Sequence, residues 1–243
     1  MQFLLQPKSN STYRSTIRVC LNVLRVPSTS RTYLTKSPNG TALTYSSPYL
    51  SVLFGSIFVF KERNLMTNSS FTTEFVVEKA KALKKRTLSI EEYSQLQNAL
   101  IQSEDNVNSF LKVNNILFAL VRDLSSNNNA LQLCAASCSC NIALGNTKAC
   151  TALTKNIGPY LVTKLDTLNY PLLVSYKMII MLSLCIWTMG NLISGSNQAF
   201  EIFHAQDCLK YIISLMHNCD NMIVPSVAYT AMHYVHIGFK YIQ

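Results

Sequence analysis

Cysteine is the residue type in this sequence best able to bind a metal ion, and three cysteines lie close together. Cys134, Cys138 and Cys140 fall within one short apolar stretch. No second pair of ligands follows at zinc-ribbon spacing, and a single helix does not direct all three thiols at one ion. Cys150 and Cys185 lie in similar helix-like sequence. We therefore expect reduced thiols that pack as small apolar side chains, and no metal site.

The remaining polar residues give no pattern typical of catalysis. The four histidines are His204, His217, His233 and His236. His233 and His236 could share a metal ion, but no third ligand is evident. No Ser–His–Asp group, pair of carboxylates or phosphate-binding glycine loop stands out. The sequence therefore predicts a protein that is not an enzyme and that needs no cofactor.

Trp187 and Asn191 combine an aromatic ring with an amide, in the stretch CIWTMGNLISG at 185–195. Residues four apart share one face of a helix, so both side chains point the same way. They lie in an uncharged run from Met178 to Phe200 that is long enough to cross a bilayer. Such a run fits a transmembrane helix or the buried helix of a larger helical stack.

A repeat decides between these two interpretations. Three stretches align without gaps and carry apolar residues at helical spacing: 116–124, 157–165 and 207–215. Each precedes a more apolar stretch, and these align as well: 135–145, 185–195 and 227–238. The period of 41 to 43 residues is typical of HEAT and armadillo arrays, with about eight extra residues near Pro171. We therefore expect an all-α solenoid of three to four repeats, in which 185–195 is a buried helix.

The stretches CIWTMGNLISG and LQLCAASCSCNIALGN resemble the armadillo repeats of importin-α, whose third helices carry a Trp-x-x-x-Asn pattern. The resemblance covers about residues 92–243, and the repeats are similar in style to divergent relatives named for transmembrane and coiled-coil domains. It implies an armadillo-type right-handed α-solenoid. It also implies an adaptor for nuclear protein import, in cytoplasm and nucleus, that holds an extended peptide on its concave face.

The resemblance also implies which residues bind the peptide. In importin-α the asparagine amide bonds to the peptide backbone, and the tryptophan ring attracts a Lys or Arg side chain. In the repeat before Trp187 the asparagine is kept, with Ser137 at the tryptophan position. The repeat after it has an aromatic residue and a histidine. The implied peptide-binding set is Trp187, Asn191, Asn141, Tyr229 and His233.

Charge argues against a basic peptide as the partner. Where importin-α has an acidic residue four positions after the asparagine, this chain has Gly195, and Leu184 replaces a usual glutamine. From residue 127 on, four acidic residues stand against six lysines. A receptor for basic peptides should present a negative groove. We expect weak binding of classical nuclear localisation signals, which leaves a different peptide or protein partner open.

A basic helical segment at 66–90 precedes the repeats. Ser89 followed by Glu92 predicts a capping box that opens the next helix. In importin-α an Arg-rich segment at this place binds importin-β, so the resemblance implies the same partner here. The alternative is a solvated helix face. The implied residues are Lys79, Lys81, Lys84, Lys85 and Arg86.

Residues 1–65 have the composition of a leader, with no acidic residue before Glu62. A mitochondrial targeting peptide, a disordered segment and a wrongly assigned start ahead of Met66 all fit. The alternative function is accordingly a membrane- or mitochondrion-associated structural scaffold. The armadillo domain is expected over 91–243, truncated at its C-terminus, and the repeats show no basic and aromatic pattern for nucleic acid.

Overall fold

The computed structural model describes residues 32–36, 42–46, 70–166, 176–218 and 223–240. From residue 70 on, the described chain forms ten α-helices and no strand. In chain order they are α3 (Thr73–Lys85), α4 (Ile90–Gln102), α5 (Glu104–Leu111), α6 (Ile116–Leu124), α7 (Asn129–Ile142), α8 (Thr147–Asp166), α9 (Tyr176–Gly195), α10 (Asn197–Ala205), α11 (Cys208–Asn218) and α12 (Val224–Phe239). This helical body confirms the predicted all-α class.

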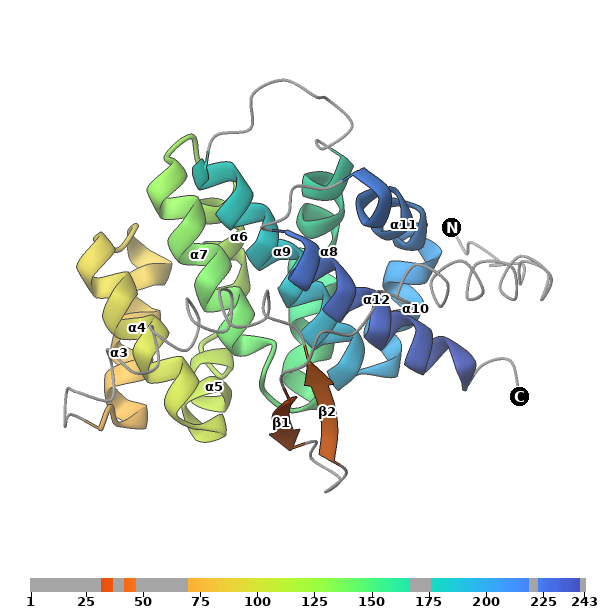
Figure 1. The fold of residues 1–243 in the computed structure, drawn as a ribbon. Coiled ribbons are helices and arrows are strands. Elements are labelled where there is room, and N and C mark those ends of the chain that lie inside the picture. The colour runs from red at the N-terminus through yellow and green to blue at the C-terminus, as the bar shows by residue number, and fades with distance from the viewer. Residues whose placement is uncertain (1–31, 37–41, 47–69, 167–175, 219–222, 241–243) are drawn as a thin grey trace, which may run out of the picture.

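One element was not predicted. Strands β1 (Thr32–Lys36) and β2 (Ala42–Ser46) pair antiparallel, with Tyr33 opposite Tyr45. This hairpin lies within the predicted leader, residues 1–65. Figure 1 draws its strands as two short arrows labelled β1 and β2. The rest of the predicted leader, and the Pro171 loop, lie outside the described residues.

Local chemistry explains where the helices begin. The Ser89 hydroxyl accepts from the Glu92 amide at 3.2 Å, and the Glu92 carboxylate accepts from the Ser89 amide at 3.0 Å. This is the predicted capping box, and it starts α4. Asn115 and Asp207 have positive φ values of 61° and 56°, and they turn the chain between α5 and α6 and between α10 and α11. Short polar side chains tolerate this left-handed conformation better than most.

The predicted helical stretches largely coincide with observed helices, although Asp207 precedes α11 and 143–145 follow the end of α7. The stretch 116–124 coincides with α6, and 207–215 forms most of α11. The stretch 157–165 is the second half of α8, which runs through Pro159 without interruption. The three more apolar stretches fall in α7, α9 and α12.

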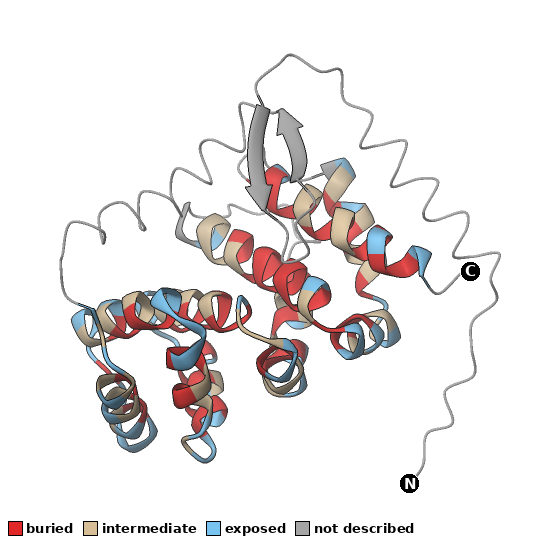
Figure 2. Cartoon of the chain, turned by 90° about the horizontal axis from the view of Figure 1, so that it is seen from below, coloured by how far each residue is buried: buried red, intermediate tan, exposed pale blue. Residues whose placement is uncertain are grey.

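Four helices lie next to one another in the order α4, α7, α9 and α12. Figure 1 shows this row crossing the molecule from the yellow helices to the blue ones. The other helices pack behind it, with α8 against α9, α6 against α7, and α11 against α12. One hydrophobic core extends from Val76 in α3 to Ile237 in α12. In Figure 2 buried residues line the sides where helices face each other, and exposed residues lie outside.

The uncharged run lies in α9. Its Met178–Gly195 segment is long and apolar enough to cross a membrane, and it is the one helix of the described residues that passes this test. Of this segment, 61% is buried inside the body. It packs against α7, α8, α10 and α12. In this structure α9 is therefore a central helix of the core.

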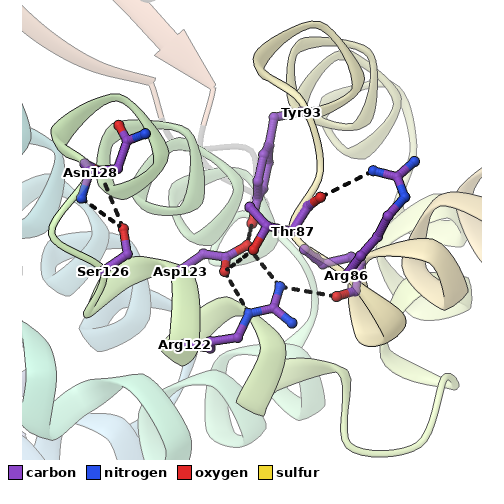
Figure 3. A network of polar contacts seen from close by, with 8 residues as sticks. Arg86, Thr87, Tyr93, Arg122, Asp123, Ser126 and Asn128 are labelled. Carbon is purple, nitrogen blue, oxygen red and sulfur yellow. Dashed lines mark hydrogen bonds and ion pairs between the residues drawn. The ribbon is translucent and has the colours of Figure 1, made fainter.

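A buried carboxylate joins helices α3, α4 and α6. Asp123 in α6 is 1% exposed and accepts hydrogen bonds from the Tyr93 hydroxyl at 2.6 Å and the Thr87 hydroxyl at 3.3 Å (Figure 3). Arg122 donates to the same carboxylate at 2.6 Å and to the carbonyl of Leu83 in α3 at 3.1 Å. The guanidinium and the two hydroxyls together compensate the buried charge. This network fixes α3, α4 and α6 relative to each other.

Removal of this carboxylate should destabilise the body strongly. Asp123→Ala leaves the Tyr93 hydroxyl without its acceptor, and we expect a loss of about 3 kcal/mol in unfolding free energy. Tyr93→Phe removes only one of the hydrogen bonds and should cost about 1–2 kcal/mol. Urea denaturation followed by circular dichroism measures both. An Asp123→Ala variant as stable as the parent would contradict the assigned role.

Candidate peptide-binding site

The structure brings the implied peptide-binding residues onto neighbouring helices of the row. Asn141 lies on α7, Trp187 and Asn191 on α9, and Tyr229 and His233 on α12. Their spacing follows from the repeat: the third-helix positions of successive units end on helices that pack side by side. Whether each side chain can bind a ligand depends on the contacts and hydrogen bonds that it already makes within the protein.

Trp187 and Tyr229 stack face to face. Their ring centroids are 4.0 Å apart and their planes differ by 10°. Trp187 is only 8% exposed. His233 meets the Tyr229 ring edge-on at 4.5 Å. Aromatic pairs in such contact contribute about 0.5–1.5 kcal/mol beyond area burial. One face of the indole is thus already covered by a ring of the next repeat.

Asn191 is also engaged within the molecule. Its side chain is 4% exposed, and its carbonyl oxygen accepts a hydrogen bond from the Tyr229 hydroxyl at 2.8 Å. Its amide nitrogen lies 3.8 Å from the Cys140 sulfur in α7, to which it donates. A thiol is a weak acceptor, so the amide keeps most of its capacity to donate. Asn191 therefore links α7, α9 and α12.

Asn141 makes the equivalent link one repeat earlier. Its amide donates to the Gln97 carbonyl in α4 at 2.9 Å, and the Gln97 amide donates to the Cys134 carbonyl in α7 at 3.0 Å. Asn141 is half-buried. Gln97 was not predicted as part of this candidate site. The available signal was its place about one period before Asn141, in sequence similar to a first repeat.

The tyrosine reaches Asn191 because Gly190 has no side chain. A Cβ atom at Gly190 would lie 2.7 Å from the Cδ1 and Cε1 atoms of Tyr229 and 2.9 Å from the Thr230 hydroxyl. That hydroxyl donates to the Ile186 carbonyl at 2.7 Å, across the α9–α12 contact. The close approach of these two helices therefore depends on glycine at this position.

The acidic residues of the row, Glu91 and Glu92, lie in α4, and Lys177 at the start of α9 is the one Lys or Arg of α7, α9 and α12. Helices α7, α9 and α12 contain no Asp or Glu. Burial, and secondly the charge of His236, lowers the pKa of His233 to about 4, so its imidazole is neutral at physiological pH. Burial raises the pKa of Cys140 to about 12, which keeps this thiol protonated. The arrangement suits hydrogen bonding and apolar contact better than the binding of a cation.

The cysteines pack as expected. Cys138, Cys140, Cys150, Cys185 and Cys208 are buried free thiols, and Cys134 is half-buried. Within the described part of the chain, no three His, Cys, Asp or Glu side chains are grouped so that they could hold a metal ion.

The basic residues predicted to bind importin-β divide into two sets. Arg86 and Lys79 both pair with Glu92, at 2.7 and 3.5 Å. The Arg86 hydrogen bond is the main reason why the pKa of Glu92 lies far below its usual value. Lys81, Lys84 and Lys85 are exposed. The opposite face of α3 enters the hydrophobic core through Val76, Ala80 and Leu83.

Comparisons with known proteins inform the fold. No family model and no curated protein matches the chain. Two crystal structures of engineered proteins from the Northeast Structural Genomics Consortium are similar, each with a TM-score of 0.54. The first is 19% identical and the match covers 66% of this chain and 37% of that one. The second is 18% identical over 68% and 62% of the two chains. This chain thus spans less than two thirds of either protein, and the similarity extends to the helical fold alone.

Gly190→Ala should weaken the α9–α12 contact. The added methyl group would overlap the Tyr229 ring, so we expect a loss of about 1–3 kcal/mol in unfolding free energy. Gly158→Ala in α8 is the matched control, because the nearest side-chain atoms lie 3.5 Å from its Cβ position. The control should change the unfolding free energy less than Gly190→Ala, because the helix preference of alanine offsets the crowding of its Cβ against the Pro159 ring. Chemical denaturation measures both unfolding free energies. Equal losses in the two variants would contradict the close approach of α9 and α12.

His233 should make stability depend on pH. Its pKa is about 4 in the folded chain and 6.5 in the unfolded chain, so between these values the unfolded chain binds more protons. Acidification from about pH 7 to about pH 5 should therefore cost about 2 kcal/mol through this one group. The His233→Gln variant should lose that part of the pH dependence, measured by urea denaturation. His217→Gln, at an exposed position, should keep it; identical profiles for parent and His233→Gln would disprove the effect.

Proposed function

We propose that the helical body is an armadillo-type right-handed α-solenoid and that it acts as a non-enzymatic adaptor for an extended peptide. The support for the solenoid is the recurring order of elements. The chain passes through α5, α6 and α7, then through α8 and α9, then through α10, α11 and α12. The last helix of each group lies against the last helix of the next. In this arrangement a peptide would bind along the row α7, α9 and α12.

The observation that carries the proposal is the chain of amide contacts between successive helices of the row. Asn141 reaches α4, and Asn191 lies between α7 and α12. A peptide backbone crossing the row would meet the half-buried Asn141 amide directly, whereas Asn191, 4% exposed, would have to exchange its bond to Tyr229 first. Repeated amides at one spacing can bond to a backbone without reading its sequence. Half-buried Asn141, Tyr229 and His233 are the members of the set best placed to meet a ligand.

The charges on α7, α9 and α12 indicate the kind of peptide. With no carboxylate on α7, α9 or α12, a lysine or arginine side chain entering the row would be desolvated without an anionic partner. A peptide with uncharged side chains avoids that cost. We therefore propose a neutral extended segment as ligand in place of a classical nuclear localisation signal. A role in nuclear import, with importin-β at α3 and residence in cytoplasm and nucleus, belongs to the same proposal.

A peptide selection tests the proposal. Random peptides displayed on phage are selected on the folded protein, and an enriched peptide is labelled for fluorescence anisotropy. Asn141→Ala and Tyr229→Ala should each weaken its binding by about tenfold, because each removes a hydrogen-bonding or stacking group from the row.

Asn156→Ala is the matched control. Asn156 is a half-buried asparagine of α8 whose amide donates to the Ala152 carbonyl at 2.8 Å, away from the row. It should bind the peptide like the parent. Enriched peptides that bind all three variants equally, or that carry clustered Lys and Arg, would contradict a neutral groove.

A further inference from the structure

A group of lysines on two helices faces one depression in the surface. Lys81, Lys84 and Lys85 lie on the same face of α3, at spacings of three and four residues. Lys112 stands opposite, at the C-terminal end of α5. Together they line a depression of about 590 Å³. A solvated helix face would place its lysines on one helix. Here the lysines come from two separate elements and line the same depression.

The four lysines have no anionic partner in the described residues. Lys79 on α3, and Arg86 directly after α3, are both paired with Glu92. By contrast, no carboxylate lines the depression, and no ion pair involves its lysines. The C-terminal ends of α3 and α5 each contribute a partial negative charge of about one half. Glu78 lines an adjoining hollow together with Lys81 and Lys85, so roughly two positive charges remain uncompensated.

We propose that this depression binds a small ligand with two or more phosphate groups. A phosphate ester carries a charge of about −1.5 to −2, so two such groups match the charge of the four lysines within this small volume. The Ser109 hydroxyl and the Asn114 amide also line the depression and can donate to phosphate oxygens. Val77 and Val113 supply apolar contact for the carbon frame of the ligand. An inositol polyphosphate, free or as a lipid headgroup, has this chemistry.

The lining favours a compact polyphosphate over a nucleic acid strand. Proteins that bind single strands stack the bases on aromatic side chains, often with arginine. Neither an aromatic residue nor an arginine is among the residues that line this depression. Lysine acts as a point charge for phosphate and needs no planar partner.

Calorimetric titration with inositol hexakisphosphate tests the site. The full chain should bind one equivalent, with inositol and inorganic phosphate as controls that bind far more weakly. Lys84→Gln/Lys112→Gln should weaken binding by about tenfold or more. Both side chains are exposed, so circular dichroism of this variant should match the parent.

The matched variant Lys148→Gln/Lys155→Gln removes the same charge from two exposed lysines of α8. It should bind like the parent, and an equal loss in both variants would overturn the proposal. Absence of binding by the parent would also overturn the proposal. So would tighter binding of a single-stranded oligonucleotide at the same site.

Binding to vesicles with phosphatidylinositol bisphosphate, and not with phosphatidylserine at equal charge, would assign the headgroup. Binding of the free compound alone would assign a soluble polyphosphate. Both of these results support the site.

Discussion

A helix that is apolar around its whole circumference must be covered on every side, and α9 imposes this constraint on the body. Its core positions face α7, α8, α10 and α12, so four helices are held in place by one. The polar residues that α9 carries are then desolvated and need partners inside the protein. Ser183 meets Ser226 at 2.6 Å, and the Ile186 carbonyl accepts from Thr230. Both partners, Ser226 and Thr230, come from α12. Burial of α9 therefore requires hydroxyl side chains at these two positions of its neighbour.

The same constraint changes what the Trp–Asn pair does. In an open groove the indole face and the amide would be available to a ligand. Here Tyr229 covers the indole and bonds to Asn191, because Gly190 lets its ring approach the α9 backbone. The pair thus first serves to hold successive helices together. A ligand of this row would meet an arrangement that is already ordered, which reduces the entropy lost on binding.

Periodicity in the sequence located α6, α7, α8, α9, α11 and α12, but it did not predict α5, α10 or the contacts between helices. The stretch 116–124 predicts α6 to the residue, and Ser89 with Glu92 predicts the start of α4, because these are local effects. The union of 147–166 into one helix through Pro159 was not predicted, since proline usually interrupts a helix. Nor was the stacking of Tyr229 on Trp187, residues 42 positions apart. Such contacts depend on the distance between packed helices, for which the glycine at 190 was the only local sign.

The two candidate surfaces differ in charge for a reason that lies in the packing. The row helices α7 and α9 are buried on several sides, where an unpaired ion would be costly, and their sequences accordingly lack carboxylates. Helix α3 is covered on one side only, so its outer face tolerates several lysines next to each other. Residues 70–126 carry seven acidic and seven basic side chains, so the α3 lysines form a local positive patch and not a net charge of this region. An anion would be attracted from solution towards α3, and a neutral segment would be retained on the row only by the fit of its backbone to the amides.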